Sequence, residues 1–190
     1  MVKVVFTGPE STGKTALAEA LSNTLGIPWV PEFARYYVAH LGRPYERTDL
    51  THIGRGQRAW EQWVAQRIPP ILICDTDWTV LQIWEHYRYG KSPNGFWYWR
   101  EGYGIPCLAD LYFLCAPDFP WQPDPLREHP YEREELFTWY EQLLQTHAAS
   151  YEILKGTLEK RLSHALRGIE RLKAFSNIIR TTEGEQQMHL

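Results

Sequence analysis

The sequence predicts an α/β fold: a three-layer sandwich in which helices cover both faces of a central parallel sheet of about five strands. Two observations support this prediction. Short apolar runs rich in β-branched and aromatic residues alternate with longer segments of helical periodicity. The 190 residues, 44% of them hydrophobic and 23% charged, suffice for one globular domain with a sizeable core. Strands that alternate with helices pair in parallel and are covered on both faces.

The first elements follow from the N-terminal residues. The run VKVVFT, residues 2–7, is short and β-branched and ends at a glycine, as a buried strand does. After a loop with two glycines, leucines recur every four residues from Leu17 to Leu25 and predict a helix, which Gly26 ends. The run IPWV, residues 27–30, predicts the second strand.

The rest of the chain continues the alternation. A helical stripe lies between Thr48 and Arg67, and Gln57 falls on it where a leucine would be expected. Two roles are open to Gln57, a bond to neighbouring backbone or contact with a ligand. Further strands are predicted at residues 70–77, 111–118 and 150–156, and further helices at about 78–89, 131–147 and 157–173. Residues 175–190 are expected to form a polar tail, in which NIIR is a candidate short strand.

Charge and cysteine content limit the partners and the location. The net charge of −3 provides no broad basic field for nucleic acid. No apolar run approaches membrane-spanning length, and no export leader is evident. Cys74, Cys107 and Cys115 lack paired spacing, so neither a zinc site nor a disulfide framework is expected. We expect a cytoplasmic protein without nucleic-acid or membrane partners, and its oligomeric state is left open.

The loop after the first strand carries the strongest functional signal. Residues 8–15, GPESTGKT, match the P-loop motif G-x-x-x-x-G-K-[ST] between a strand and a helix, as the motif requires. Backbone N–H groups in such a loop cradle phosphate oxygens, and the helix dipole favours the same charge. Lys14 is suited to reach the β- and γ-phosphates and Thr15 to coordinate Mg²⁺. The loop therefore predicts ATP and Mg²⁺ as cofactors, bound by Gly8, Glu10, Ser11, Thr12, Gly13, Lys14 and Thr15.

Charged residues also follow the second and third strands. Glu32 and Arg35 come after one, and Asp75 and Asp77 end the other. Ligands of parallel sheets bind at this carboxyl edge, beside the loop. Asp75 is suited to hold Mg²⁺ together with Thr15. Helix capping is the alternative for each acid taken alone, but three carboxylates near one loop favour a site.

Residues 118–133, rich in proline and charge, include Arg127 and Arg133. A segment of this kind between a strand and a helix suits a mobile lid that brings an arginine onto transferring phosphates. An ordinary solvated loop is the alternative. For the aromatic run FWYW at 96–99 and the neighbouring tryptophans, core packing is the main interpretation.

The charges at the strand ends bear on the phosphate acceptor. An acceptor that already carries a phosphate requires several basic residues. Here the strand ends carry three acidic residues, Glu32, Asp75 and Asp77, and one basic residue, Arg35. This balance favours a neutral or cationic acceptor with hydroxyl groups, because carboxylates bind ribose hydroxyls and aromatic faces attract cations.

Five motifs, GPESTGKT, WVPEFARYY, ICDTDWTVLQIW, LYFLCAPDFPWQPDPLR and YEILKGTLEKRLSHA, together resemble the ribosylnicotinamide kinase domain of NadR-type proteins. The resemblance runs from about residue 2 to 172. It implies a P-loop NTPase fold of the nucleoside-kinase type over residues 1–174. It also implies transfer of the ATP γ-phosphate to the 5′-hydroxyl of nicotinamide riboside, which makes the mononucleotide in NAD salvage. The sequence begins at the kinase strand, so adenylyl transfer is not expected of it.

The interpretation as a nicotinamide riboside kinase assigns a role to each candidate residue. Lys14 and Arg127 would stabilise the transferring phosphoryl group, and Thr15 and Asp75 would bind Mg²⁺. Glu32 or Asp77 would bind the ribose or accept the 5′-hydroxyl proton. Arg35, Asp75 and Trp84 would contact the acceptor, and Trp84 would lie against the pyridinium ring. Pro125 departs from the family's lid pattern D-G-x-R. Two rivals remain, a kinase of another nucleoside or small alcohol and a P-loop ATPase or nucleotide-binding switch.

Overall fold

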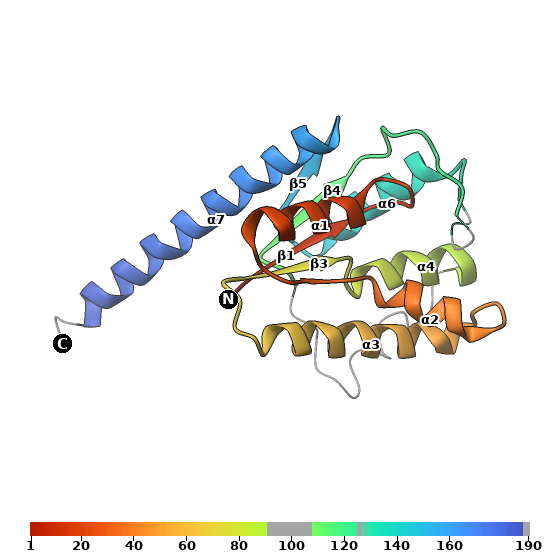
Figure 1. The fold of residues 1–190 in the computed structure, drawn as a ribbon, viewed down its shortest axis with the longest axis horizontal. Helices are drawn as coiled ribbons and strands as arrows, with labels where there is room; N and C mark the ends of the chain where they lie inside the picture. The colour runs from red at the N-terminus through yellow and green to blue at the C-terminus, as the bar shows by residue number, and fades with distance from the viewer. Residues whose placement is uncertain (91–107, 125–126, 128, 188–190) are drawn as a thin grey trace.

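The computed structural model describes residues 1–90, 108–124, 127 and 129–187. Its elements, in chain order, are β1 Val2–Thr7, α1 Lys14–Leu25, β2 Trp29–Val30, α2 Phe33–Leu41, α3 Arg47–Ala65, β3 Ile71–Asp75, α4 Thr79–Tyr89, β4 Leu111–Cys115, α6 Arg133–Thr146, β5 Tyr151–Leu154 and α7 Leu158–Gln187 (Figure 1). The aromatic run at 96–99, Cys107 and Pro125 lie outside the described residues.

The five strands form one parallel sheet in the order β2-β3-β1-β4-β5, which confirms the predicted fold class. β1 is central, and its Phe6 is in register with Asp75 of β3 and Phe113 of β4. The carboxyl ends of these three strands therefore lie together. The chain crosses from one side of β1 to the other between β3 and β4, so this edge is also the topological switch point where α/β sheets bind ligands.

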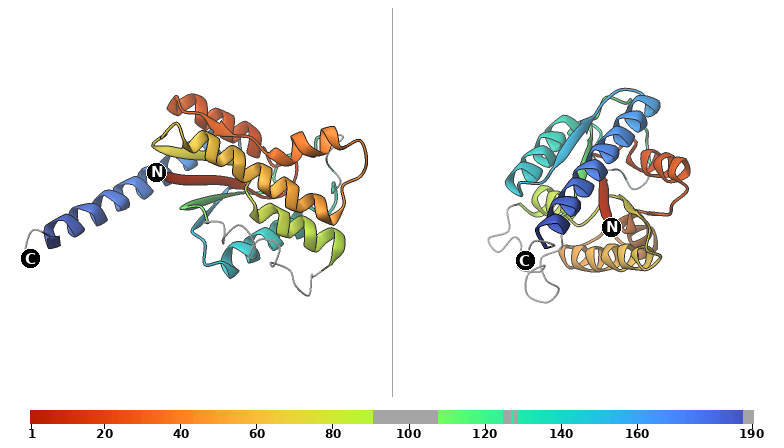
Figure 2. Two further views of the ribbon diagram at one scale, coloured as in Figure 1. Left: turned by 90° about the horizontal axis from the view of Figure 1, so that it is seen from below. Right: turned by 90° about the vertical axis from the view of Figure 1, so that its left-hand side faces the viewer.

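Helices cover both faces of the sheet (Figure 2). Val5 and Phe6, neighbours on β1, belong to different apolar clusters because successive side chains of a strand point to opposite faces. The Val5 cluster includes side chains of α2, α3, α4 and α6, and the Phe6 cluster includes side chains of α1 and α7. Three layers result, with β1 buried between two cores.

The buried thiols of Cys74 and Cys115 belong to opposite apolar clusters, as expected for cysteines inside strands. Within the described residues, no helix has both the length and the apolar character needed to cross a bilayer.

The structure corrects two element predictions. α2 was not predicted because its 9 residues are too few for a long periodic pattern and Ala34 is its one buried residue. α7 runs on to Gln187, so residues 177–180 are helical and not a strand. No proline interrupts this part of the sequence, and the helix continues past the sheet (Figure 1). The division into residues 1–174 and 175–190 stays a prediction.

Candidate active site

The loop between β1 and α1 has the backbone that a phosphate cradle needs. Gly8 has a φ of 128°, and a Cβ there would lie 2.7 Å from the carbonyl oxygen of Cys115. Only glycine lets β4 approach so closely. Ser11 and Gly13 take left-handed φ angles of 55° and 79°. Left-handed residues within such a turn point successive N–H groups into one concavity, which suits an anion.

Lys14 places its positive charge across this loop. It is the first residue of α1, so the amino end of the helix faces the same space. Its Nζ donates to the carbonyl oxygens of Gly8, at 2.9 Å, and Pro9, at 2.7 Å. Loop N–H groups, helix dipole and ammonium together suit the binding of an anion.

Thr15 and Asp75 provide oxygen ligands suited to Mg²⁺. Thr15 Oγ1 donates to Asp75 Oδ2 at 2.6 Å. Asp75 Oδ1 is buried and has no hydrogen-bond partner among the described residues. An orphaned carboxylate oxygen beside a hydroxyl fits a hard cation that takes its remaining ligands from phosphate and water. No group of three or more His, Cys, Asp or Glu side chains in the described part of the chain is arranged to hold a metal alone.

Glu32 and Arg35 extend the site toward α2. Glu32 immediately precedes α2, and both side chains line the cavity described below. Arg35 Nε lies 3.6 Å from Glu32 Oε2, and its Nη1 donates to Asp124 at 3.0 Å. Burial raises the pKa of Glu32 to about 7; the Asp75 carboxylate adds to the rise, and Lys14 and Arg35 oppose it. Glu32 therefore changes charge near neutral pH.

Asp77 does not reach the cavity, which corrects its predicted placement. The residue is 1% exposed. Its Oδ1 accepts from the backbone N–H of Thr79, at 2.9 Å, and from the Thr79 hydroxyl, at 2.6 Å, while Oδ2 accepts from the Tyr112 hydroxyl at 2.8 Å. Lys3 Nζ lies 3.7 Å from Oδ2. Asp77 therefore belongs to a buried polar network with Thr79, Tyr112 and Lys3 and does not line the cavity.

The segment between β4 and α6 lies against the phosphate loop. Arg127 lines the cavity and donates to Ser11 Oγ, at 3.5 Å, and to the carbonyl oxygen of Gln122, at 2.5 Å. Arg133 donates instead to the carbonyl oxygens of Phe119, at 2.9 Å, and Ser11, at 3.4 Å, and does not line the cavity. Of the two arginines, Arg127 is placed to meet a phosphate.

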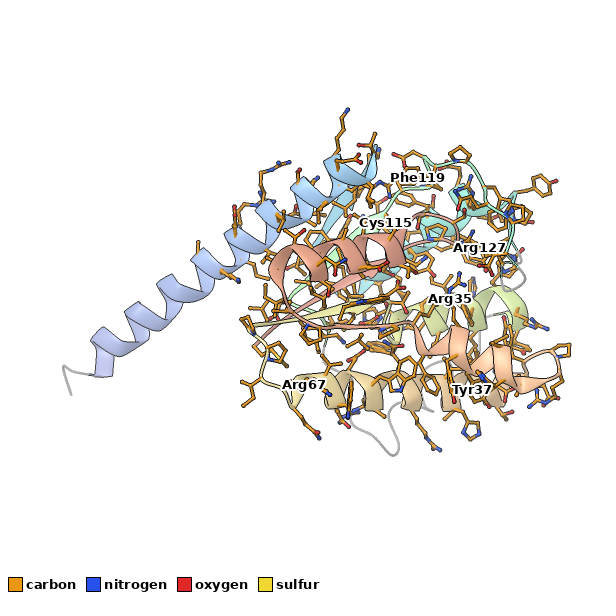
Figure 3. The ribbon with its side chains drawn as sticks, in the orientation of Figure 1. Arg35, Tyr37, Arg67, Cys115, Phe119 and Arg127 are labelled. Carbon is orange, nitrogen blue, oxygen red and sulfur yellow. The ribbon has the colours of Figure 1, made fainter. Side chains whose placement is uncertain are left out.

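One cavity of about 550 Å³ joins these parts. The predicted site residues that line it are Gly8, Glu10, Ser11, Thr12, Gly13, Lys14, Thr15, Glu32, Arg35, Trp84 and Arg127. Figure 3 shows Arg127 and Arg35 at the same end of the molecule, with Arg67 toward the other. The volume of this cavity is that of a small-molecule site.

Several lining residues were not found from the sequence. Tyr45 and Tyr140 form an aromatic wall with Trp84; the Tyr45 and Trp84 ring centroids are 5.7 Å apart. Phe119 and His129 also line the cavity. Only the last two carried a signal, because they lie in the proline-rich segment that the composition had singled out. An isolated tyrosine in a loop or helix has no pattern that separates a site from a core.

Comparison with known proteins agrees with this architecture. The model of a family described as AAA domain matches residues 3–161. No curated protein is similar enough in sequence to count as a relative.

Solved structures with the same fold include two of NadR. NadR in complex with NR, nicotinamide riboside, has a TM-score of 0.73 and 20% identity, over 90% of this chain and 51% of that one. NadR with NAD and AMP-PNP has a TM-score of 0.69 and 20% identity, over 90% and 49%. A deoxyadenosine kinase from M. mycoides has a TM-score of 0.60 and 11% identity, over 90% and 100%.

The chain thus spans about half the length of the NadR chains that it matches. At these identities the likeness is one of fold, and the fold is that of P-loop nucleoside and nucleotide kinases. Because the family model covers most of the sequence, the chain belongs to the AAA domain family, and within it has a P-loop kinase fold.

Proposed function

We propose that this protein is an ATP-dependent kinase that phosphorylates the 5′-hydroxyl of nicotinamide riboside to give nicotinamide mononucleotide. The observation that carries the proposal is a single cavity in which a phosphate loop faces a wall with an acidic and several aromatic side chains. A nucleotide-dependent switch needs the loop but has no need of this second wall.

The loop side of the cavity suits the donor nucleotide. Lys14 and the loop N–H groups would bind the β- and γ-phosphates, and Arg127 would face the transferring group. Thr15 and Asp75 would hold Mg²⁺, which neutralises charge on the phosphate oxygens when bound.

The opposite wall suits an acceptor without a phosphate of its own. Among the described lining residues, Arg35 is the basic side chain on this wall, and it already pairs with Asp124 and Glu32. The carboxylate of Glu32 and the aromatic face of Trp84 favour a cation that carries hydroxyl groups. One face of Tyr45 is already covered by the Arg88 guanidinium, at 4.2 Å, so the pyridinium contact is assigned to Trp84.

We assign the proton of the acceptor hydroxyl to Glu32, which lines the cavity. In the transfer, the 5′-oxygen forms a bond to the γ-phosphorus as the bond to the leaving ADP oxygen breaks. Glu32 accepts the hydroxyl proton as its carboxylate, or binds the ribose. Asp77, the other candidate, has both oxygens engaged inside the protein. The similarity in fold to a NadR structure that contains nicotinamide riboside supports the choice of acceptor.

The test compares acceptors of different charge. Initial rates of ADP formation would be measured with nicotinamide riboside, its reduced and uncharged form, neutral nucleosides and a nucleoside monophosphate, and products identified by mass. We expect the cation to have the highest kcat/KM, and Glu32→Gln to lower this preference. Asp77→Asn serves as the control, because it lowers stability without changing the ranking.

Two outcomes would contradict the proposal. A monophosphate as the best acceptor would mean that the acceptor wall has been assigned the wrong charge preference. A neutral nucleoside with a higher kcat/KM than the cation would mean that the protein is a nucleoside kinase with a different substrate.

A further inference from the structure

Arg161, in the first turn of α7, is an arginine with no access to solvent: its exposure is 0%. A buried guanidinium is costly unless each of its donors is paired. No feature of the sequence set it apart, and it does not line the cavity.

The guanidinium joins three separate segments through their carbonyl oxygens. Nε donates to Gly156, between β5 and α7, at 2.9 Å; Nη1 donates to Thr12 in the phosphate loop at 2.9 Å; and Nη2 donates to Ala116, just after β4, at 2.9 Å. Nη2 also bonds the carboxylate of Asp118. A planar fork of donors can meet these acceptors at once, whereas an ammonium cannot.

The Arg161 guanidinium also holds the first residues of the segment between β4 and α6. The Asp118 carboxylate accepts a second bond from the Gly156 N–H at 2.7 Å. The Arg161 guanidinium carbon lies 4.4 Å from the centre of the Phe119 ring. That ring in turn lies against the loop, since a Cβ on Gly13 would be 3.5 Å from it. Figure 3 shows Phe119 and Cys115 together at the end of the sheet where α1 begins.

The hydrogen bond from Arg161 to the Thr12 carbonyl sets the orientation of the peptide group between Thr12 and Gly13. In a planar trans peptide, the C=O of one residue and the N–H of the next point in opposite directions. Arg161 holds the Thr12 carbonyl toward the protein interior, so the Gly13 N–H is turned the other way. Gly13 lines the cavity and takes a left-handed φ of 79°, so its orientation is not set by an ordinary helical start.

We propose that Arg161 is a positioning residue that aims the Gly13 N–H at the nucleotide phosphates by holding the carbonyl of the same peptide from behind. This inference rests on the proposed binding of nucleotide at the loop. Arg161 itself touches no substrate. A purely structural Arg161 would lower stability but leave the Gly13 N–H correctly aimed in every folded molecule.

The test follows the Gly13 amide proton by NMR as Mg-ADP is added to the full chain. In the parent protein this proton should move downfield, because it forms a charge-assisted bond to phosphate. In Arg161→Lys the movement should shrink to less than half, and the Kd for ADP should rise about tenfold, the loss of one such bond. Asp118→Asn, which keeps the Arg161 donor to Thr12, and Arg171→Gln, elsewhere on α7, should behave as the parent.

The outcomes separate the two proposals. A parent protein that binds no Mg-ADP would remove the proposed function itself. Parent-like Gly13 movement in a folded Arg161→Lys protein would overturn the role of Arg161 alone. If that variant does not fold, the parent still decides: a through-bond coupling between the Arg161 guanidinium and the Thr12 carbonyl should be present with ADP bound, and its absence would contradict the proposal.

Discussion

Glu32 and Asp75 are two carboxylates beside one phosphate loop with different surroundings. Asp75 accepts the Thr15 hydroxyl, and its other oxygen has no hydrogen-bond partner in the described part of the chain. Glu32 lines the open cavity near Arg35. Burial raises the pKa of both carboxyls above their ordinary values. On their hydrogen bonding and position, and not on their pKa values, we propose Asp75 for the metal and Glu32 for proton transfer.

The rate should depend on the charge of Glu32. Because its pKa is raised to about 7 and only the carboxylate accepts a proton, kcat/KM for the acceptor should rise with pH and level off above about 7. Glu32→Gln should lose about 100-fold or more in turnover, and its residual rate should show no bend near neutrality. Steady-state rates at saturating Mg-ATP measure this, and a bend that persists in the variant would place the titrating group elsewhere.

The raised pKa of Glu32 should also make stability depend on pH, in the direction opposite to that of the rate. A carboxyl whose pKa rises from 4.5 in the unfolded chain to about 7 in the folded one binds more protons when folded. The free energy of unfolding should therefore fall as pH rises from the lower value to the higher. Glu32→Gln should be more stable than its parent at about pH 8 and equal to it at about pH 4. Thermal unfolding of both proteins at the two pH values checks the sign.

Arg127 and Arg133 form a matched pair on one segment. Arg127 lines the cavity, whereas Arg133 holds backbone carbonyls of Ser11 and Phe119. Arg127→Ala should lower kcat about 10³-fold with little change in the riboside KM, since it acts on transition-state charge. Arg133→Ala should lower stability and affect kcat much less. Steady-state kinetics of both variants test this, and the reverse order of losses would move the role to Arg133.

The contact between α2 and α3 positions Glu32. Gln57 of α3 accepts the backbone N–H of Phe33 at 2.8 Å, so the start of α2 is capped from α3 and the Glu32 side chain makes no capping bond. A second contact joins α2 and the loop after it to the start of α3, where Asp49 accepts hydrogen bonds from Arg43 and Tyr37. Gln57 thus bonds backbone, the first of its two sequence-based alternatives.

Gly56 makes the close approach of these helices possible. A Cβ at this position would overlap the Phe33 ring, so Gly56→Ala must displace that ring at the start of α2. We expect a loss of stability of about 1–3 kcal/mol and a fall in kcat/KM for the acceptor of roughly 10- to 100-fold, with ADP affinity nearly unchanged. Unfolding curves and acceptor kinetics measure the two effects.

Gly168→Ala is the control for that substitution. Its Cβ would lie 3.1 Å from the Phe113 ring, in the cluster on the other face of the sheet. It should cost stability and leave acceptor kinetics as they were. Equal losses of acceptor use in both variants would mean that general loosening, and not the placement of Glu32, is responsible.

Local patterns were sufficient to predict the sheet and the phosphate loop. Every strand is a short apolar run whose pattern depends on its own residues, and the loop motif encodes its backbone through glycines such as Gly8. α2 was missed because it is short, and contacts such as the bond from Phe33 N–H to Gln57 are formed with another helix. The tail was misjudged because polar composition does not end a helix that lacks a stop signal.

The site was predictable where a residue's role follows from its place at a strand end. Asp75, the last residue of β3, and Glu32, just after β2, satisfy that condition, whereas Lys14 and Thr15 were found from the loop motif. Asp77 satisfied it too, but the turn after β3 directs its carboxylate to Tyr112 and Thr79. Long-range partners of this kind are not visible in a linear pattern. Arg161 was missed for the same reason, because its acceptors are backbone carbonyls far away in the sequence.

Phosphoryl transfer and hydrolysis differ in what receives the γ-phosphate, so counting products decides between a kinase and a switch. ATP and the protein would be incubated with and without nicotinamide riboside, and ADP, free phosphate and phosphorylated riboside all measured, with Lys14→Ala as the inactive control. We predict little ADP without the riboside and, with it, one phosphorylated riboside for each ADP. ADP formation at the same rate without acceptor, matched by free phosphate and abolished in the Lys14 variant, would show an ATPase and contradict the assignment.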